Sequence, residues 1–336
     1  MRSVTYRIVE KVAKIIGHKK TFQLPVPELR AYIETIRNGQ KFAPPGYVYK
    51  KHSVIEECIC GRPCYVIAPK NGEKKGGAES NGTKSGNEKA VLFLHGGGFI
   101  YEAHPVHWLA ASKLVTRLGV TVWFPAYPLI PNTSGEKFPN PEFSSGGGDF
   151  KCMNEMIAKV YGRMLETYSA AGITFLGDSA GAMLSLIYCH HNKALKMPQP
   201  MPAKLVLLSP GIITEQDKTI LDEMYKIEPR DVMLSMPFTV ALISLLNLDL
   251  SRDNYFNAPL YGDFTGFPPL YVFSGTFEIF YPQLTRFVER IKAAGLPIEF
   301  YSGNEMMHVW PYMPASREAR AALNQIFAII SRSETS

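Results

Sequence analysis

A serine in a Gly-x-Ser-x-Gly pattern is the residue whose setting could most readily support chemistry. Ser179 lies in the stretch GDSAG, which follows an apolar run expected to be a strand and opens a segment expected to be a helix. A chain that turns this sharply leaves no room for a side chain two positions before or after the serine, which accounts for Gly177 and Gly181. The N-terminus of a helix also favours developing negative charge. The pattern therefore predicts that Ser179 is a nucleophile.

A serine hydroxyl needs a base to remove its proton and an acid to orient that base. Where the serine occupies such a strand-to-helix turn, the acid and then the histidine follow later strands along the chain. Glu278 follows the strand-like run LYVFSG, and His308 follows the next such run, IEFYSG. These positions predict His308 as the base and Glu278 as the acid, with Glu305 as the weaker choice of acid.

The other histidines and two aspartates have structural interpretations. Asp178 lies inside the turn and cannot readily face His308, and Asp263 precedes its strand, at the wrong end of the sheet. The histidines assigned to a helix end, to the N-terminal region or to the wall of a glycine loop are His18, His52, His104, His107, His190 and His191. We therefore prefer none of them as the base, and we expect no metal site.

Three consecutive glycines follow the buried run AVLFL in the stretch HGGGF. A carbonyl attacked by Ser179 becomes a tetrahedral oxyanion, and preorganised N–H donors stabilise it by about 3 to 4 kcal/mol each. Glycines let the backbone approach closely enough to present such donors. Gly97 and Gly98, together with the N–H of Ala180, are therefore predicted to form an oxyanion hole, and His95 is expected to brace the loop.

Short strand-like runs alternate with helical patterns through the middle and end of the chain, which predicts a mostly parallel eight-stranded sheet flanked by helices. The first two strands are joined by a tight turn and are expected to be antiparallel. The expected strands are 47–57, 64–68, 90–95, 119–126, 173–177, 204–209, 268–274 and 297–302. The expected helices are 105–117, 150–170, 180–193, 281–294 and 315–332.

Two helical segments do not follow this alternation and are predicted to form one cap. They are the N-terminal part, residues 1–45, and an inserted part, residues 212–258. The core that carries the sheet would then consist of residues 46–211 and 259–336. Within its first part, residues 69–89 are almost purely polar and are expected to be a mobile surface loop.

The first helix is amphipathic and is not a membrane span. Val4, Ile8, Val12, Ile15 and Ile16 lie on one helical face, and basic residues lie elsewhere. The commoner explanation is that the apolar stripe packs on the body of the protein. The alternative is that the basic face lies on an anionic bilayer. The most apolar later stretch, residues 233–246, is also too short to span a membrane.

Charge and cysteine content limit the classes of partner and the compartment. The net charge of +6 arises from 36 basic and 30 acidic residues spread along the chain, so no nucleic-acid partner is expected. Five cysteines are an odd number and no secretory signal is expected, which favours a reducing cytoplasm without disulfides. The stretch CICGRPC is interpreted as two strands around a Gly61-Arg62-Pro63 turn, because no fourth ligand for zinc follows it.

With these motifs identified, residues of about 45–330 resemble the hormone-sensitive-lipase-like family of α/β-hydrolases. The stretches that carry the resemblance are HGGGF, GDSAG, YPLIP, LLSPGI, GDFTGFPPLYVFSGTFEIF and MMHVWP. The resemblance implies an α/β-hydrolase fold with an N-terminal plus internal cap, and hydrolysis of short acyl esters through an acyl-serine intermediate without a cofactor. Glu278 departs from the usual pattern, in which aspartate is commoner, and gives the acid a longer arm.

Several alternatives remain open at the level of the sequence. An amide or formamide hydrolase, or a deacetylase, would use the same Ser-His-Glu triad on another substrate. A non-catalytic small-molecule receptor on the same fold is disfavoured, because the serine, the histidine and the glycine loop are all present. The expected partner is a small-molecule ester, and a homodimer that pairs through the last strand and helix is a further option.

Overall fold

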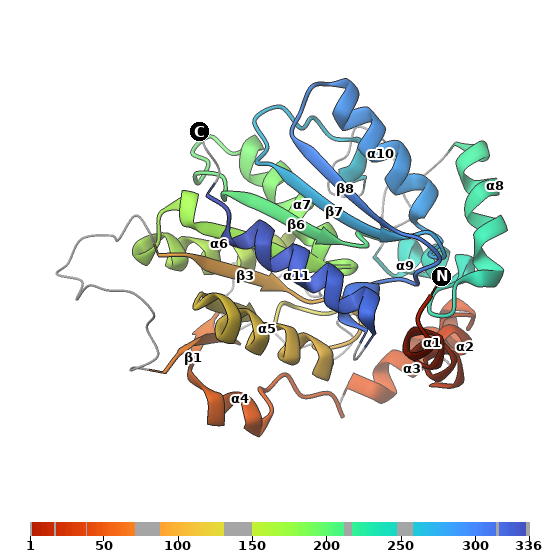
Figure 1. The fold of residues 1–336 in the computed structure, drawn as a ribbon, viewed down its shortest axis with the longest axis horizontal. Helices are drawn as coiled ribbons and strands as arrows, with labels where there is room; N and C mark the ends of the chain where they lie inside the picture. Colours follow the sequence, from red (N-terminus) through yellow and green to blue (C-terminus); the bar gives the residue numbers. More distant parts are fainter. Residues whose placement is uncertain are drawn as a thin grey trace.

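The computed structural model describes residues 2–16, 18–37, 39–70, 88–130, 150–211, 217–246, 258–313 and 316–333 (Figure 1). These residues form an eight-stranded sheet in the order β1-β2-β4-β3-β5-β6-β7-β8. The pairs β1–β2 and β2–β4 are antiparallel, and all other neighbours are parallel. The prediction of an eight-stranded, mostly parallel sheet is therefore confirmed. The strands are β1 His52–Ile59, β2 Arg62–Pro69, β3 Ala90–Leu94, β4 Thr121–Pro125, β5 Ile173–Asp178, β6 Lys204–Leu208, β7 Leu270–Gly275 and β8 Ile298–Gly303.

Helices cover both faces of this sheet, with α5 and α11 on one face and α6, α7 and α10 on the other (Figure 1). The described α-helices are α1 Val4–Ile16, α2 His18–Thr21, α3 Val26–Arg37, α4 Gly46–Lys51, α5 Pro105–Leu118, α6 Phe150–Thr167, α7 Ala180–Ala194, α8 Lys218–Ile227, α9 Met236–Leu246, α10 Tyr281–Ala293 and α11 Arg317–Ser331. None of them combines the length and the apolar character that crossing a membrane requires.

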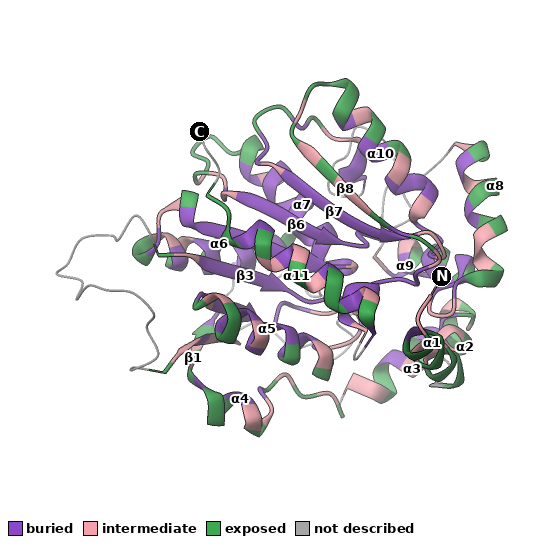
Figure 2. Ribbon diagram, viewed as in Figure 1, coloured by how far each residue is buried: buried purple, intermediate pink, exposed green. Residues whose placement is uncertain are grey.

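The central strands are buried on both faces, as Figure 2 shows. In β3, Val91 and Phe93 pack into the cluster under α5 and α11, whereas Leu92 and Leu94 pack into the cluster under α6 and α7. Successive side chains of a strand point to opposite faces, so a strand covered on both sides must be apolar at every position. The run AVLFL satisfies that requirement, and it ends where the glycine loop begins.

The start of the first strand was predicted wrongly. Residues 47–51 belong to α4, and β1 begins at His52. Pro45 precedes this short helix and its carbonyl accepts the N–H of Val48, whose side chain is buried beside α5. The run Tyr-Val-Tyr is too short to distinguish a helical period from a strand period, and the preceding prolines start the turn.

The hairpin between β1 and β2 turns one residue earlier than predicted. Its two turn residues are Cys60 and Gly61, with φ of 53° and 73°, and Arg62 and Pro63 already belong to β2. Two successive left-handed residues match the twist of an antiparallel hairpin. All five cysteines are free, and no cluster of three potential metal ligands occurs within the described residues.

The commoner interpretation of α1, that its apolar stripe packs on the body of the protein, is wrong. Tyr6 is buried, whereas the predicted stripe is exposed at its described positions, Val4, Ile8, Val12 and Ile15. The side chain of Ile16 lies outside the described residues. The helix packs through its other side because Tyr6 finds a buried hydrogen-bond partner there, the N–H of Met307.

The N-terminal helices and the inserted helices α8 and α9 lie together near the ends of the parallel strands (Figure 1). The Phe22 and Phe238 rings stack with their centroids 3.8 Å apart, and Lys19 Nζ donates to the carbonyl oxygen of Asp231 at 2.7 Å. These contacts join the two segments predicted to form a cap. Residues 71–87, 212–216 and 247–257, which include most of the predicted mobile loop, lie outside the described residues.

Candidate active site

Ser179 lies at the sharp turn between β5 and α7, as predicted. Its backbone has φ of 48° and ψ of −116°, a conformation that costs roughly 1 to 3 kcal/mol for a residue other than glycine. Two hydrogen bonds hold it: Ser179 N donates to Leu208 O at 2.8 Å, and Met183 N donates to Ser179 O at 3.1 Å. A Cβ on Gly181 would lie 2.0 Å from the carbonyl oxygen of Leu94, so only glycine fits at that position.

The structure brings the side chains of Ser179, His308 and Glu278 together in one hydrogen-bonded line. His308 Nε2 lies 2.9 Å from Ser179 Oγ, and His308 Nδ1 lies 3.1 Å from Glu278 Oε2. The histidine and the glutamate are both buried, and Ser274 Oγ donates to the second carboxylate oxygen of Glu278. The carboxylate can only accept, so Nδ1 carries the imidazole proton and Nε2 is free to accept the serine proton.

Glu305, the weaker choice of acid, and the two aspartates that were not preferred have other partners. Glu305 Oε2 lies 3.2 Å from Arg2, and Asp263 Oδ2 lies 2.6 Å from Lys193. Asp178 Oδ2 lies 3.2 Å from Nε2 of His107, which gives His107 its place beside the glycine loop. A Cβ on Gly96 would lie 2.2 Å from that same carboxylate oxygen, so Asp178 packs directly against the first glycine of the loop.

Two N–H groups of the glycine loop and one at the start of α7 donate to no residue that the structure describes. Gly97 and Gly98 have φ of 124° and 60°. No described residue accepts a hydrogen bond from the N–H of Gly97, Gly98 or Ala180. Ala180 is the first residue of α7, where N–H groups have no partner within the helix. A Cβ on Gly98 would lie 2.9 Å from the Phe238 ring, so α9 closes directly over the loop.

His95 is buried at the start of this loop and links it to the residues around it. Its Nδ1 donates to Gly96 O at 2.7 Å, and the Tyr127 hydroxyl donates to His95 O at 2.6 Å. The His95 and Tyr127 rings stack with centroids 4.4 Å apart. Burial, reinforced by nearby His107, lowers the pKa of His95 to about 3. His95 is therefore neutral and holds the loop through hydrogen bonds and stacking rather than through charge.

Sequence reasoning missed Asp231, a fully buried carboxylate between α8 and α9. One of its oxygens accepts from Met233 N and Leu234 N at 2.8 and 2.9 Å. The other accepts at 3.0 Å from the N–H of Ile279, the residue directly after Glu278. Burial raises the pKa of Asp231, while the charge of His308 and the N–H donors oppose that rise. Because both oxygens accept hydrogen bonds, the ionised form is the one that fits this site.

Replacing Asp231 with asparagine should lower kcat by roughly 10 to 100-fold, because the amide cannot accept on both sides and the Glu278 loop shifts. The change also removes a negative charge near His308, so protonation of His308 becomes less favourable. The acidic limb of kcat/KM should then move to lower pH. The measurement is a pH series of kcat and KM.

The matched control is Asp222→Asn, which makes the same chemical change on the exposed side of α8, where Asp222 pairs with Lys218. An unchanged pH profile in Asp231→Asn, with only a lower melting temperature, would show that Asp231 serves stability alone.

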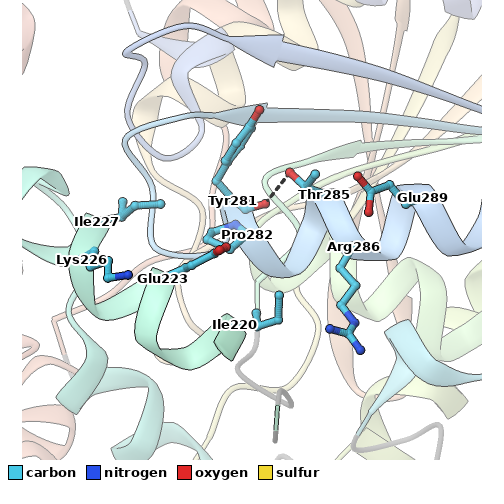
Figure 3. A pocket seen from close by; sticks show the side chains of 9 residues that line it. All are labelled: Ile220, Glu223, Lys226, Ile227, Tyr281, Pro282, Thr285, Arg286 and Glu289. Carbon is cyan, nitrogen blue, oxygen red and sulfur yellow. Dashed lines mark hydrogen bonds between the residues drawn. The ribbon is translucent and has the colours of Figure 1, made fainter. Parts of the chain in front are cut away.

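A separate cavity of about 630 Å³ lies between α8 and α10 and does not include the hydrogen-bonded line (Figure 3). Thr285 Oγ1 donates to the Tyr281 carbonyl along its wall. The residues that line it are Ile220, Glu223, Lys226, Ile227, Tyr281, Pro282, Thr285, Arg286 and Glu289. Its lining includes two carboxylates, Glu223 and Glu289, and two cations, Lys226 and Arg286.

A family model described as alpha/beta hydrolase fold matches residues 91–312. A curated relative, an esterase from Acinetobacter venetianus, is 28 % identical over 240 residues, which cover 69 % of this chain and 72 % of the esterase. A triacylglycerol lipase from Mycobacterium tuberculosis is 25 % identical over 220 residues, covering 66 % of this chain and 41 % of the lipase. The solved structure of an esterase from the bacterial hormone-sensitive lipase family is similar, with a TM-score of 0.71 and 21 % identity over 99 % of both chains. Because the family model spans most of the sheet and the whole hydrogen-bonded line, the chain belongs to the alpha/beta hydrolase fold family.

Proposed function

We propose that the protein is a serine carboxylesterase that hydrolyses short-chain acyl esters through an acyl-serine intermediate. The observation that carries the proposal is the line from Ser179 Oγ through the His308 imidazole to Glu278, with contacts of 2.9 and 3.1 Å. It is supported by the relatives, which are named as an esterase and a triacylglycerol lipase.

In the proposed reaction His308 Nε2 takes the proton of Ser179 as the oxygen attacks the ester carbonyl carbon. The carbonyl oxygen becomes an oxyanion that the N–H groups of Gly97, Gly98 and Ala180 stabilise. When the C–O bond to the alcohol breaks, His308 returns the proton to the leaving oxygen, and the acyl group stays on the serine.

A water molecule then repeats the sequence. His308 takes its proton, the hydroxide oxygen attacks the acyl carbon, and the proton returns to the oxygen of Ser179 as the carboxylic acid leaves. Throughout, Glu278 holds the Nδ1–H of His308, which keeps Nε2 directed at the serine and stabilises the protonated imidazole. His95 keeps the glycine loop in place through its bond to Gly96 O.

The preference for short acyl chains rests on the roof of the site. Phe238 of α9 lies against Gly98, and Phe22 stacks on Phe238. Two aromatic rings so close to the oxyanion loop leave little length for an acyl chain.

The two segments that supply these rings are assigned to one cap, residues 1–45 and 212–258, over a core of residues 46–211 and 259–336. The five free cysteines support the proposed cytoplasmic location. A homodimer that pairs through β8 and α11 stays a prediction.

The test is a series of p-nitrophenyl esters from acetate to palmitate, with a fluorophosphonate label to mark the nucleophile. Activity should peak at short chains, and the label should be found on the peptide that contains Ser179. If no ester is hydrolysed while formyl or acetyl amides are, the site is an amidase or deacetylase. If neither class is hydrolysed and a ligand still binds, the receptor alternative holds.

A further inference from the structure

The outer face of α1 carries a stripe of exposed apolar side chains. Val4, Ile8, Val12 and Ile15 are 64, 56, 47 and 82 % exposed. Their spacing places them on one side of the helix, since positions three, four and eight residues apart share a face. Exposed apolar residues that occur singly need no explanation, but a contiguous stripe on a helix marks a surface that another apolar phase covers.

The stripe cannot turn inward, because the other face of α1 is fixed to the body. The buried hydroxyl of Tyr6 accepts from Met307 N at 2.6 Å, and Val9 and Ala13 pack against the core. Just before the helix, the backbone N–H and the hydroxyl of Ser3 donate to the two carboxylate oxygens of Glu318 on α11, both at 2.6 Å. The outward direction of the stripe is therefore set by hydrogen bonds and packing on the opposite side.

Basic side chains border the stripe. Arg7, Lys11 and Lys14 are exposed, and no described acidic residue pairs with them. The acidic residue of the helix, Glu10, pairs with Arg2 at 2.7 Å. The exposed side of α1 thus combines apolar contact area with net positive charge, which is the combination that binds a helix flat on anionic lipid.

We propose that this face of α1, the α1 surface, docks the protein on an anionic lipid bilayer. Val4, Ile8, Val12 and Ile15 would enter the boundary between headgroups and acyl chains, while the three basic side chains meet lipid phosphates. Pairing of two α1 surfaces in a dimer would bring like charges together, so charge complementarity favours lipid over a second copy. The proposal goes beyond ester hydrolysis and does not depend on it.

The test is co-sedimentation of the full chain with phosphatidylcholine vesicles, with and without phosphatidylglycerol. Binding should require phosphatidylglycerol and weaken as salt is added. Ile8→Gln and Ile15→Gln should each weaken binding roughly tenfold. Lys11→Gln and Lys14→Gln should each weaken it roughly fivefold. The matched control is Ile55→Gln on β1, where the isoleucine is 58 % exposed, and it should bind as the unmodified chain does.

Two results would overturn the proposal. One is vesicle binding that Ile8→Gln and Ile15→Gln leave unchanged, because another surface would then be responsible. The other is absence of vesicle binding together with a dimer, seen by analytical ultracentrifugation, that these substitutions dissociate. Vesicle binding is measured without turnover, so its outcome stays separate from that of the esterase test, and hydrolysis of soluble esters by the four variants should be unchanged.

Discussion

Replacing Ser179 with alanine should lower kcat for a short p-nitrophenyl ester by roughly 10⁴ to 10⁶-fold and leave KM nearly unchanged. The reason is that His308 Nε2, which lies 2.9 Å from Ser179 Oγ, then has no hydroxyl to activate. The groups proposed to bind the ester, the cap and the glycine loop, are not altered by the substitution. Residual hydrolysis would come from water activated by His308 or from the oxyanion donors alone. The measurement is steady-state kinetics on purified variant and unmodified protein.

The control for this prediction is Ser185→Ala. Ser185 is buried on α7, the helix that begins directly after Ser179, and its hydroxyl donates to Gly181 O at 3.0 Å. Ser185→Ala therefore removes a serine without removing the proposed nucleophile. A melting temperature close to that of the unmodified protein would show that Ser179→Ala remains folded. If Ser179→Ala kept more than a small fraction of the activity, the proposed acyl-serine mechanism would be refuted.

Replacing Glu278 with glutamine should lower kcat by roughly 10⁴-fold. A glutamine amide can donate to Nδ1, which moves the imidazole proton to Nε2 and leaves His308 unable to accept the proton of Ser179. It also removes the negative charge that stabilises the imidazolium. The measurement is kcat as a function of pH. The loss of kcat should persist from about pH 6 to pH 9.

Glu305→Gln is the matched control, because Glu305 was the weaker acid candidate and its ion pair with Arg2 is partly exposed. Its activity should stay within about twofold, as expected for a surface ion pair. Glu278→Asp tests the length of the acidic side chain. Activity should fall, because the shorter side chain cannot contact both the Ser274 hydroxyl and His308 Nδ1 as glutamate does. A large loss in Glu305→Gln with none in Glu278→Gln would reverse the assignment of the acid.

The central sheet and the hydrogen-bonded line could be predicted because both depend on local patterns. The run at β3 is apolar at every position, and the turn at Ser179 excludes side chains at its flanking glycines, so each is visible within a few residues. Parallel strands also bring their carboxyl ends to one edge of the sheet. Residues after β5, β7 and β8 therefore converge, although they are far apart along the chain.

The role of Asp231 and the orientation of α1 could not be predicted for a shared physical reason. Each depends on a backbone N–H that belongs to a distant segment, and every residue except proline carries one. Asp231 accepts from Ile279, 48 residues later, and no side-chain pattern marks that pair. Amphipathicity showed that α1 has two faces, but the bond from Met307 to Tyr6 decides which one lies inward.

The hydrogen bond between Met307 and Tyr6 also has a consequence for folding during synthesis, because it cannot form until residue 307 has been made. Tyr6 and Met307 are 301 residues apart, and Ser3 and Glu318 are 315 apart. The first helix leaves the ribosome long before the loop that carries His308, and contacts this distant along the chain form late in folding. Ser179 is likewise synthesised 129 residues before His308, the base proposed for it. The proposed nucleophile can therefore be activated only after the segment that carries His308 has been synthesised and folded.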